Sequence, residues 1–449
     1  MLTSLCKTLR RGSLALLLVL IPVLFVAQPG WAGETEWLLE FSGGYRDSDD
    51  ARFAVNFPFG PDQIPAGQDA VLLQTVDPGS SAEFSSVTIE LRHTWDRIAV
   101  GLKLDYLDLN DRNPTSSAEE YDLDELWLRF GTEPEPAIVP ERTGFYAKIG
   151  KFPRFERQDD RHLESYGLAT TTFNRLEDVG LEIGADLGRF FFVKGSYTQG
   201  NPLFMRDPNA LAGDNGTEAF NQVNPDPEFG SGIPIPYDAD IHDVDFEEPE
   251  VGLGVGGRYS DDSGNRGFEL LLWRTERKLQ DTVAIDGSFY GGDLDLLLGP
   301  LNLFPFPVTS NDKTEDGVNL WVYVGGFSAF AQVVDQDLAG LPRSGFEAEL
   351  GWHFDLPIVW SAGERQILPS IAPAIRYSNL DADFSGPAVT PSPSFSWDWE
   401  KWDYGLRIGL FGESDLTLEY SDNSFTLASG RDVPLDELLA TLRIRFAGP

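Results

Sequence analysis

Strict alternation of side-chain polarity near the C-terminus constrains the fold of this chain more than any other feature. Between Leu438 and Phe446, apolar residues occupy every second position, and mostly polar or basic residues lie between them. Because successive side chains of a β-strand point to opposite faces, this pattern predicts a strand with one apolar and one wet face. About nine residues of such a strand, when tilted, cross the hydrocarbon core of a bilayer. The stretch therefore predicts a strand suited to a membrane.

Residues 1–32 have the pattern of a secretory signal peptide. Lys7, Arg10 and Arg11 precede an apolar run from Leu14 to Ala27, and small residues follow up to Ala32. We expect cleavage after Ala32, because a transmembrane anchor would need a longer apolar run and different flanks. The mature chain is then residues 33–449.

Composition excludes several classes of protein. The chain has 34 basic and 72 acidic residues and a formal net charge of −38, which argues against nucleic-acid binding. The only cysteine, Cys6, lies in the signal peptide, so the mature protein has no disulfide and no cysteine nucleophile or metal ligand. No second run of about 18 apolar residues follows, so a membrane-spanning structure has to be a barrel.

Period-2 alternation recurs along the mature chain and predicts an all-β transmembrane antiparallel barrel. Short turns after even-numbered strands and long polar loops after odd-numbered ones are typical of such barrels. The long connections 132–143 and 356–365 leave fourteen or eighteen strands open, and a soluble β-sandwich or propeller is the less favoured alternative. About sixteen strands are expected, near residues 35–46, 84–95, 97–107, 121–131, 144–152, 178–186, 189–198, 250–260, 266–277, 317–325, 326–335, 345–355, 366–378, 403–411, 415–421 and 437–446.

If the apolar side chains face lipid, the alternate side chains line a water-filled lumen. Sixteen strands leave an aqueous channel rather than a packed core. A basic wall is expected on the first and last strands, and the segment 154–176 after the fifth strand adds further arginines. Alternatively, these charges only neutralise their neighbours and hydrate the interior. The predicted pore-lining and constriction residues are Arg92, Lys103, Arg129, Lys148, Arg154, Arg157, Arg161, Arg376, Arg407 and Arg443.

The stretch Gly-Phe-Tyr-Ala-Lys-Ile-Gly-Lys-Phe-Pro-Arg-Phe at 144–155, the following Arg-rich segment and Gly-Leu-Glu-Ile-Gly at 180–184 resemble the phosphate-selective porin family. More loosely, residues 121–198 and the C-terminal strand are similar to sixteen-stranded porins. The resemblance implies a homotrimeric diffusion channel in the outer membrane of a Gram-negative bacterium, surrounded by lipid and lipopolysaccharide. It also implies that the third long loop folds inward. The long loops are strongly acidic, as at 238–250, and this negative charge argues against a preference for anions.

The sequence predicts no enzyme, no cofactor and no bound metal. His93 is expected in an interfacial aromatic belt beside Trp95. His162 follows two aspartates, as in the Asp–His pair of outer-membrane proteases, but such adjacency is expected by chance among 72 acidic residues. His242 lies in an acidic loop that suits calcium, although a solvated loop is simpler. The competing functions are a secreted or periplasmic β-rich binding protein or glycosidase, and a conduit that exports an anionic polysaccharide.

Overall fold

The computed structural model describes most of the mature chain and leaves the predicted signal peptide outside its described part. The residues described are 33–49, 53–55, 71–73, 79–107, 122–131, 144–158, 161–173, 177–200, 246–261, 263–279, 306–357, 361–362, 365–384, 397–426, 430 and 432–448. No helix among these residues is long and apolar enough to cross a membrane.

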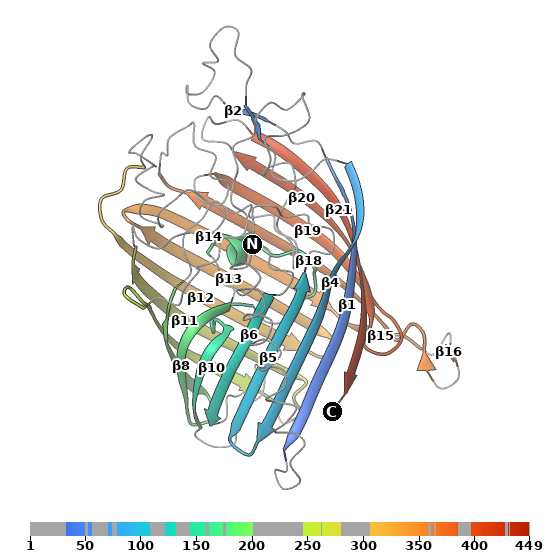
Figure 1. Ribbon diagram of the computed structural model, residues 1–449. Coiled ribbons are helices and arrows are strands. Elements are labelled where there is room, and N and C mark those ends of the chain that lie inside the picture. The colour runs from blue at the N-terminus through green and yellow to red at the C-terminus, as the bar shows by residue number, and fades with distance from the viewer. Residues whose placement is uncertain are drawn as a thin grey trace, which may run out of the picture.

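Sixteen long strands form one closed antiparallel barrel (Figure 1). The barrel closes because β1 pairs with β4 on one side and with β21 on the other. The predicted number of sixteen is therefore confirmed. The strands are β1 (Glu34–Ser48), β4 (Gly79–Trp95), β5 (Ile98–Leu107), β6 (Asp122–Gly131), β7 (Phe145–Pro153), β8 (Glu177–Leu187), β9 (Phe191–Thr198), β10 (Glu250–Ser260), β11 (Arg266–Lys278), β12 (Asp312–Val324), β13 (Phe327–Leu338), β14 (Leu341–Trp352), β18 (Ser370–Ala382), β19 (Asp398–Gly409), β20 (Asp415–Thr426) and β21 (Asp432–Gly448).

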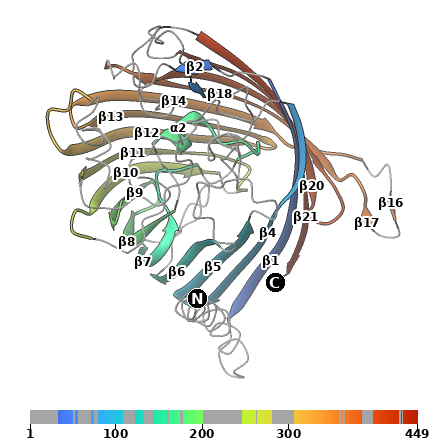
Figure 2. The ribbon, with the colours of Figure 1, turned by 45° about the horizontal axis from the view of Figure 1, so that its top comes forward.

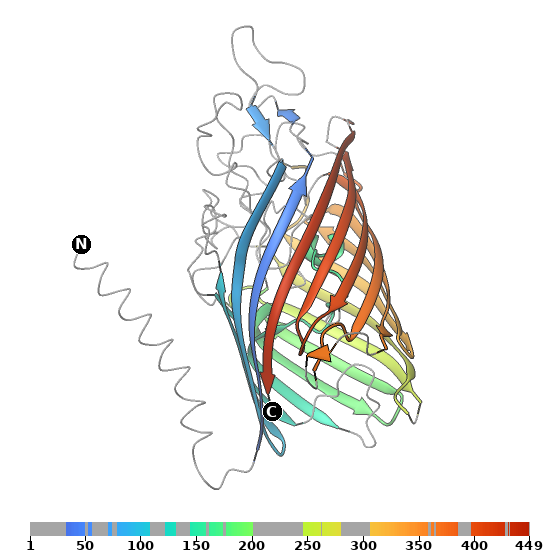
Figure 3. The same ribbon diagram turned by 90° about the vertical axis from the view of Figure 1, so that its right-hand side faces the viewer.

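Short strands lie outside this set. The two-residue strand β15 (Phe354–Asp355) extends the barrel sheet by pairing with β18. Two small hairpins pair β2 (Phe53–Val55) with β3 (Val71–Leu73), and β16 (Ser361–Ala362) with β17 (Arg365–Gln366). The second hairpin stands away from the barrel (Figure 1), near the end where β1 begins and β21 ends (Figure 3). We call that end of the barrel the terminal end and the opposite one the far end.

Apolar side chains point outward and mostly polar ones inward. On β11, Phe268 and Leu272 on the outer face are 43% and 48% exposed, whereas Glu269 between them points inward and is buried. A soluble β-sandwich would bury the outer residues in a core, so that alternative is wrong. An outward apolar band is instead the surface that a membrane barrel presents to lipid.

The polarity of the two faces reverses near the far end of β19. Toward the terminal end, Trp402 and Tyr404 point outward, and the inward Lys401 is buried. Closer to the far end, Asp398 and Glu400 point outward, and Trp399 is buried inside. Aromatic girdles mark the edges of the lipid-facing band in outer-membrane barrels. The strand therefore continues beyond the band, where its charged face meets water.

Strands that continue beyond the apolar band correct the prediction that a long polar loop follows every odd-numbered strand. A long polar loop was expected between residues 335 and 345, but β13 and β14 are joined by Ala339 and Gly340 alone. Both have positive φ, 57° and 86°, as a tight hairpin turn requires. Asp337, in the stretch expected to be a loop, lies with Asp335 on the exposed outer face of a paired strand. The two-residue turns predicted at Asp96-Arg97 and Gly325-Gly326 are confirmed.

The described part of the segment between β7 and β8 lies inside the barrel (Figure 2). Its described parts are residues 154–158 and 161–173, which include the short helix α2 (Leu168–Thr172). This helix contacts β13, β14 and β18 on the opposite wall. We call the described residues 154–158 and 161–173 the inward segment. The structure therefore agrees with the expected inward fold of the third long loop.

Candidate functional site

At the start of the inward segment, Arg154 is held by ion pairs with carboxylates. Arg154 Nε donates to Glu156 Oε1 at 2.7 Å, and its Nη2 contacts Glu250, which also pairs with Lys313 at 2.9 Å. Burial alone would lower the pKa of Arg154, but the carboxylates of Glu156 and Glu250 outweigh it and raise that pKa well above the usual value. Arg154 was predicted to line the constriction, and it is instead a buried support.

The segment then runs along the wall from β10 to β13. The ring of Phe155 lies so close to Gly254 that a Cβ there would stand 2.8 Å from it. The backbone carbonyl of Glu156 accepts hydrogen bonds from Asn319 Nδ2 at 2.5 Å and from Gln332 Nε2 at 2.8 Å. These amides lie on β12 and β13, so the inner face of the barrel holds the backbone of the segment directly.

Arg376 on β18 is the central anchor. Its Nε donates to Asp403 Oδ2 at 2.9 Å, its Nη1 to the Ser165 carbonyl at 2.9 Å and its Nη2 to Ser165 Oγ at 2.6 Å. Arg376 and Asp403 are both fully buried. The prediction that Arg376 lines the pore is therefore wrong, because the inward segment covers the wall on which it lies.

Two glutamates of the wall complete the attachment. Glu419 Oε2 accepts the backbone N–H groups of Glu164 at 3.0 Å and Ser165 at 3.3 Å. Glu347 faces the start of α2, where a Cβ on Gly167 would lie 2.0 Å from the Glu347 carboxyl carbon. Only glycine fits there without a shift. The segment is thus fixed by buried charges, and each such bond contributes more than a neutral one.

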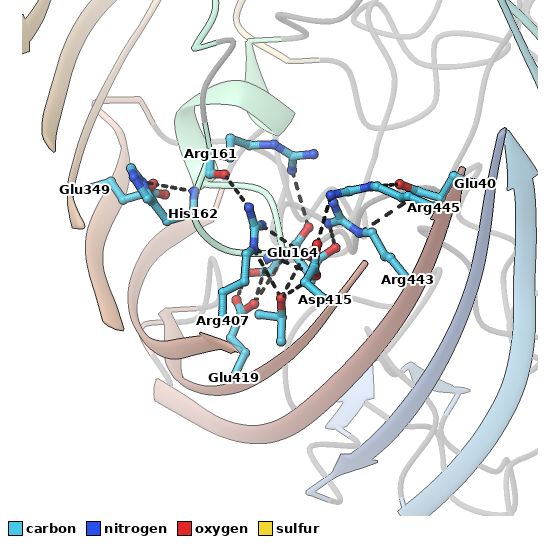
Figure 4. Close-up of polar contacts among 12 residues, drawn as sticks. Glu40, Arg161, His162, Glu164, Glu349, Arg407, Asp415, Glu419, Arg443 and Arg445 are labelled. Carbon is cyan, nitrogen blue, oxygen red and sulfur yellow. Dashed lines mark hydrogen bonds and ion pairs between the residues drawn. The ribbon is translucent and has the colours of Figure 1, made fainter. Parts of the chain in front are cut away.

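At the tip of the segment, a carboxylate meets the arginines of the wall (Figure 4). Glu164 Oε1 accepts from Arg407 Nη2 at 3.1 Å, and Glu164 Oε2 contacts Arg443 Nη2. Arg445 bridges Asp415 at 2.9 Å and Glu40 on β1. These contacts join the segment to β19 and β21 and, through Glu40, to the first strand.

The other predicted pore residues occupy the wall from β4 to β7. Lys103 pairs with Asp124 and, at 3.7 Å, with Asp105. Arg129 and Lys148 are mostly buried and lie 5.8 and 5.4 Å from the centroid of the Trp127 ring. Arg92 is half-buried on β4.

Ion pairs with carboxylates therefore hold at least six of the ten predicted residues: Lys103, Arg154, Arg157, Arg376, Arg407 and Arg443. Arg161 contacts the Tyr166 ring and the Glu164 carbonyl. An unbroken basic wall is not what the described residues form. They form a network of both signs, closer to the alternative in which charges neutralise one another.

Sequence reasoning missed the role of His162 and its partners. His162 Nδ1 lies 2.7 Å from Glu349 Oε1, and its Nε2 lies 2.7 Å from Ser328 Oγ. No local motif could have shown this, because the three residues come from the inward segment, β14 and β13. His93 does lie beside Trp95, with ring centroids 4.1 Å apart, and bonds Thr35.

Metal ligands do not gather in the described part of the chain. Among those residues, no three His, Asp or Glu side chains are placed to hold a metal ion. His242 and most of the acidic stretch 238–250 lie outside the described residues.

Comparison with known proteins shows a shared fold. No protein-family model matches the chain, and no curated protein sequence is similar to it. The structure resembles the outer membrane channel DcaP of Acinetobacter baumannii with a TM-score of 0.50 and 9% identity, covering 93% of this chain and 99% of that one. OprB of Pseudomonas putida follows with a TM-score of 0.47 and 12% identity, covering 92% and 94%. The chain has the closed sixteen-stranded fold of an outer-membrane porin.

Proposed function

We propose that this protein is an outer-membrane porin that lets small hydrophilic or charged solutes diffuse through its lumen without converting them. The observation that carries the proposal is the combination of an outward apolar band with an inner wall of charged and polar residues. Lipid accepts the first surface and water the second. The terminal end then faces the periplasm and the far end faces the cell exterior, where lipopolysaccharide surrounds the barrel.

The inward segment narrows the lumen. Its bonds to β12, β13, β18 and β20 fix it against one half of the wall. Solutes then pass beside the free edge of the segment, near Arg157 and Arg161, and along the half-buried Arg92 and Lys103 of the wall from β4 to β7. Arg129 and Lys148 belong to the same wall but are only 7% and 8% exposed. Arg407 and Arg443 border the tip. A wide conduit for a polysaccharide fits this filled interior less well.

Assembly as a homotrimer, and any preference for phosphate, belong to the same proposal. They are supported by the residues at 144–155 and 180–184 that resemble the phosphate-selective porins. Cross-linking and native mass measurement in detergent test the trimer directly.

Channel activity is tested in planar lipid bilayers. Purified mature protein should give stepwise conductance increments, and it should run faster on a gel before boiling than after. Extraction without detergent, or bilayers that stay silent at protein levels where a known porin inserts, would contradict the proposal.

A further inference from the structure

Three side chains inside the barrel form a hydrogen-bonded chain of serine, histidine and glutamate. Ser328 Oγ lies 2.7 Å from His162 Nε2, and His162 Nδ1 lies 2.7 Å from Glu349 Oε1. Figure 4 shows the His162–Glu349 pair at the side of the inward segment. A nucleophile within bonding distance of a base that a third group orients is the arrangement that activates a hydroxyl.

The glutamate fixes which nitrogen of the imidazole carries the proton. Glu349 Oε1 also accepts the backbone N–H of His162 at 2.9 Å, and Arg376 Nη1 lies 3.5 Å from its other oxygen. A carboxylate held in this way acts as the acceptor for Nδ1–H. Nε2 is then the acceptor, so Ser328 O–H donates to it. This is the tautomer in which histidine can remove the serine proton.

The position of the imidazole depends on a glycine. Gly351 lies directly across the strand pair from Ser328, and a Cβ on it would stand 2.6 Å from His162 Cδ2. The ring therefore lies over Gly351 beside the serine. Ser328 is the second residue after the Gly325-Gly326 turn at the terminal end, and both Ser328 and His162 are half-buried rather than sealed. Solutes that enter the lumen from this end can approach the hydroxyl.

We propose that Ser328 is a nucleophilic modification site, activated by His162 and Glu349, that takes reactive acyl and phosphonyl compounds. Ser328 Oγ forms the new bond to the carbonyl carbon or phosphorus, and the bond to the leaving group breaks. The proton from Oγ passes to His162 Nε2 and then to the departing group or to solvent. The N–H groups of β13 and β14 beside Ser328 belong to paired strands. Within the described part of the chain, the site thus has no dedicated oxyanion hole, and the proposed reaction stops at the modified serine.

A fluorophosphonate reporter tests this on the full mature protein in detergent. Its P–F bond breaks as the Oγ–P bond forms, and fluoride leaves. Mass mapping should find the label on Ser328 and not on Ser165. Ser165 is fully buried and its hydroxyl donates to the Glu419 carboxylate, so label on Ser165 would reveal unfolded protein. Only protein that keeps its faster unheated gel mobility is scored.

Two variants separate activation from exposure. His162→Gln removes the base and should slow labelling by about 100-fold or more, the usual contribution of general-base catalysis. Gly351→Ala keeps all three polar groups but displaces the ring, and should slow labelling similarly. Unlabelled Ser328 in the folded wild type, or equal labelling rates in wild type and either folded variant, would overturn the proposal. These outcomes are independent of conductance, so the porin function can stand or fall separately.

Discussion

Glu164 Oε1 lies 3.1 Å from Arg407 Nη2, and the two side chains differ in how far they reach the lumen: Arg407 is 24% exposed and Glu164 is 6% exposed. The same order holds where Arg445, at 20%, covers Asp415, at 5%. It reverses on the outer surface, where Arg274 is 49% exposed and Glu276 59%. In these two pairs at the tip of the inward segment, the cation therefore stands nearer the water and the carboxylate lies beneath it.

The first prediction concerns charge selectivity at the tip of the inward segment. Arg443→Gln should move the reversal potential in a salt gradient toward cation preference, and Glu164→Gln should move it the opposite way. In a narrow lumen each charge acts at a lower effective dielectric than on the surface. The outer-surface variant Arg274→Gln is the matched control and should leave the potential unchanged. A shift of the same sign for Arg443→Gln and Glu164→Gln would refute the assignment.

Salt concentration gives a second prediction on the same cluster. The Debye length falls from about 10 Å at 0.1 M to about 3 Å at 1 M, so distant charges are screened first. The shift in reversal potential caused by Arg443→Gln should persist at 1 M salt, because the Arg443 side chain would act on passing ions at close range. Loss of the shift at high salt would mean that Arg443 acts from a distance.

The third prediction concerns the buried anchor. Arg376→Met removes the bonds to Asp403 and Ser165 and takes away the cation that the buried Glu349, Asp403 and Glu419 share, which costs about 3–5 kcal/mol. We expect the inward segment to detach, so single-channel conductance should rise and fluctuate. Arg274→Met, on the exposed outer face, is the control. Unchanged conductance in folded Arg376→Met protein would show that other contacts suffice.

A fourth prediction tests the assignment of the two faces. Ile183 on β8 points outward and is 47% exposed, whereas Ser196 on β9 points inward and pairs with Glu182. Ile183→Lys places a cation in lipid at a cost of about 2–4 kcal/mol near the midplane. Ser196→Lys places the same cation opposite a carboxylate in the lumen. Folded yield, read from heat-dependent gel mobility, should fall only for Ile183→Lys.

The barrel could be predicted from the sequence because its lipid-facing residues are a one-dimensional signal. On β20, Leu416, Leu418 and Tyr420 alternate with polar residues, and that period alone specifies a strand and its outer face. The strand ends were predicted less well. Asp398 and Glu400 lie on the same face of β19 as Trp402 and Tyr404 but beyond the apolar band. In the sequence, their charges therefore look like those of a polar loop.

The functional site was predicted only in part. The inward course of the segment was implied by the resemblance to porins, whose third long loop folds inward, but the roles of its residues were not. Whether Arg376 and Arg407 are exposed to water depends on their contacts with Ser165 and Glu164. The residues of each pair are more than 200 positions apart in the sequence. Alternation assigns a side chain to the inner face, and it carries no information about what covers that face.

The last prediction concerns Gly167, which packs closely against the barrel wall at the start of α2. A Cβ at this position would lie 2.0 Å from the Glu347 carboxyl carbon. Gly167→Ala should therefore push the inward segment from β14, alter conductance and destabilise the protein by about 1–3 kcal/mol, as overpacking usually does. The φ of Gly167 is −74°, so backbone strain does not contribute.

Gly195→Ala on β9 is the control for this change, since its Cβ would meet atoms only at 3.6 Å and beyond. Removing the obstacle should rescue the variant: in Gly167→Ala with Glu347→Ala, the methyl group occupies space that the carboxylate has left. Conductance of the double variant should return toward that of Glu347→Ala alone, because contacting residues are not additive. Additive effects of the two substitutions would show that Gly167 and Glu347 do not constrain each other.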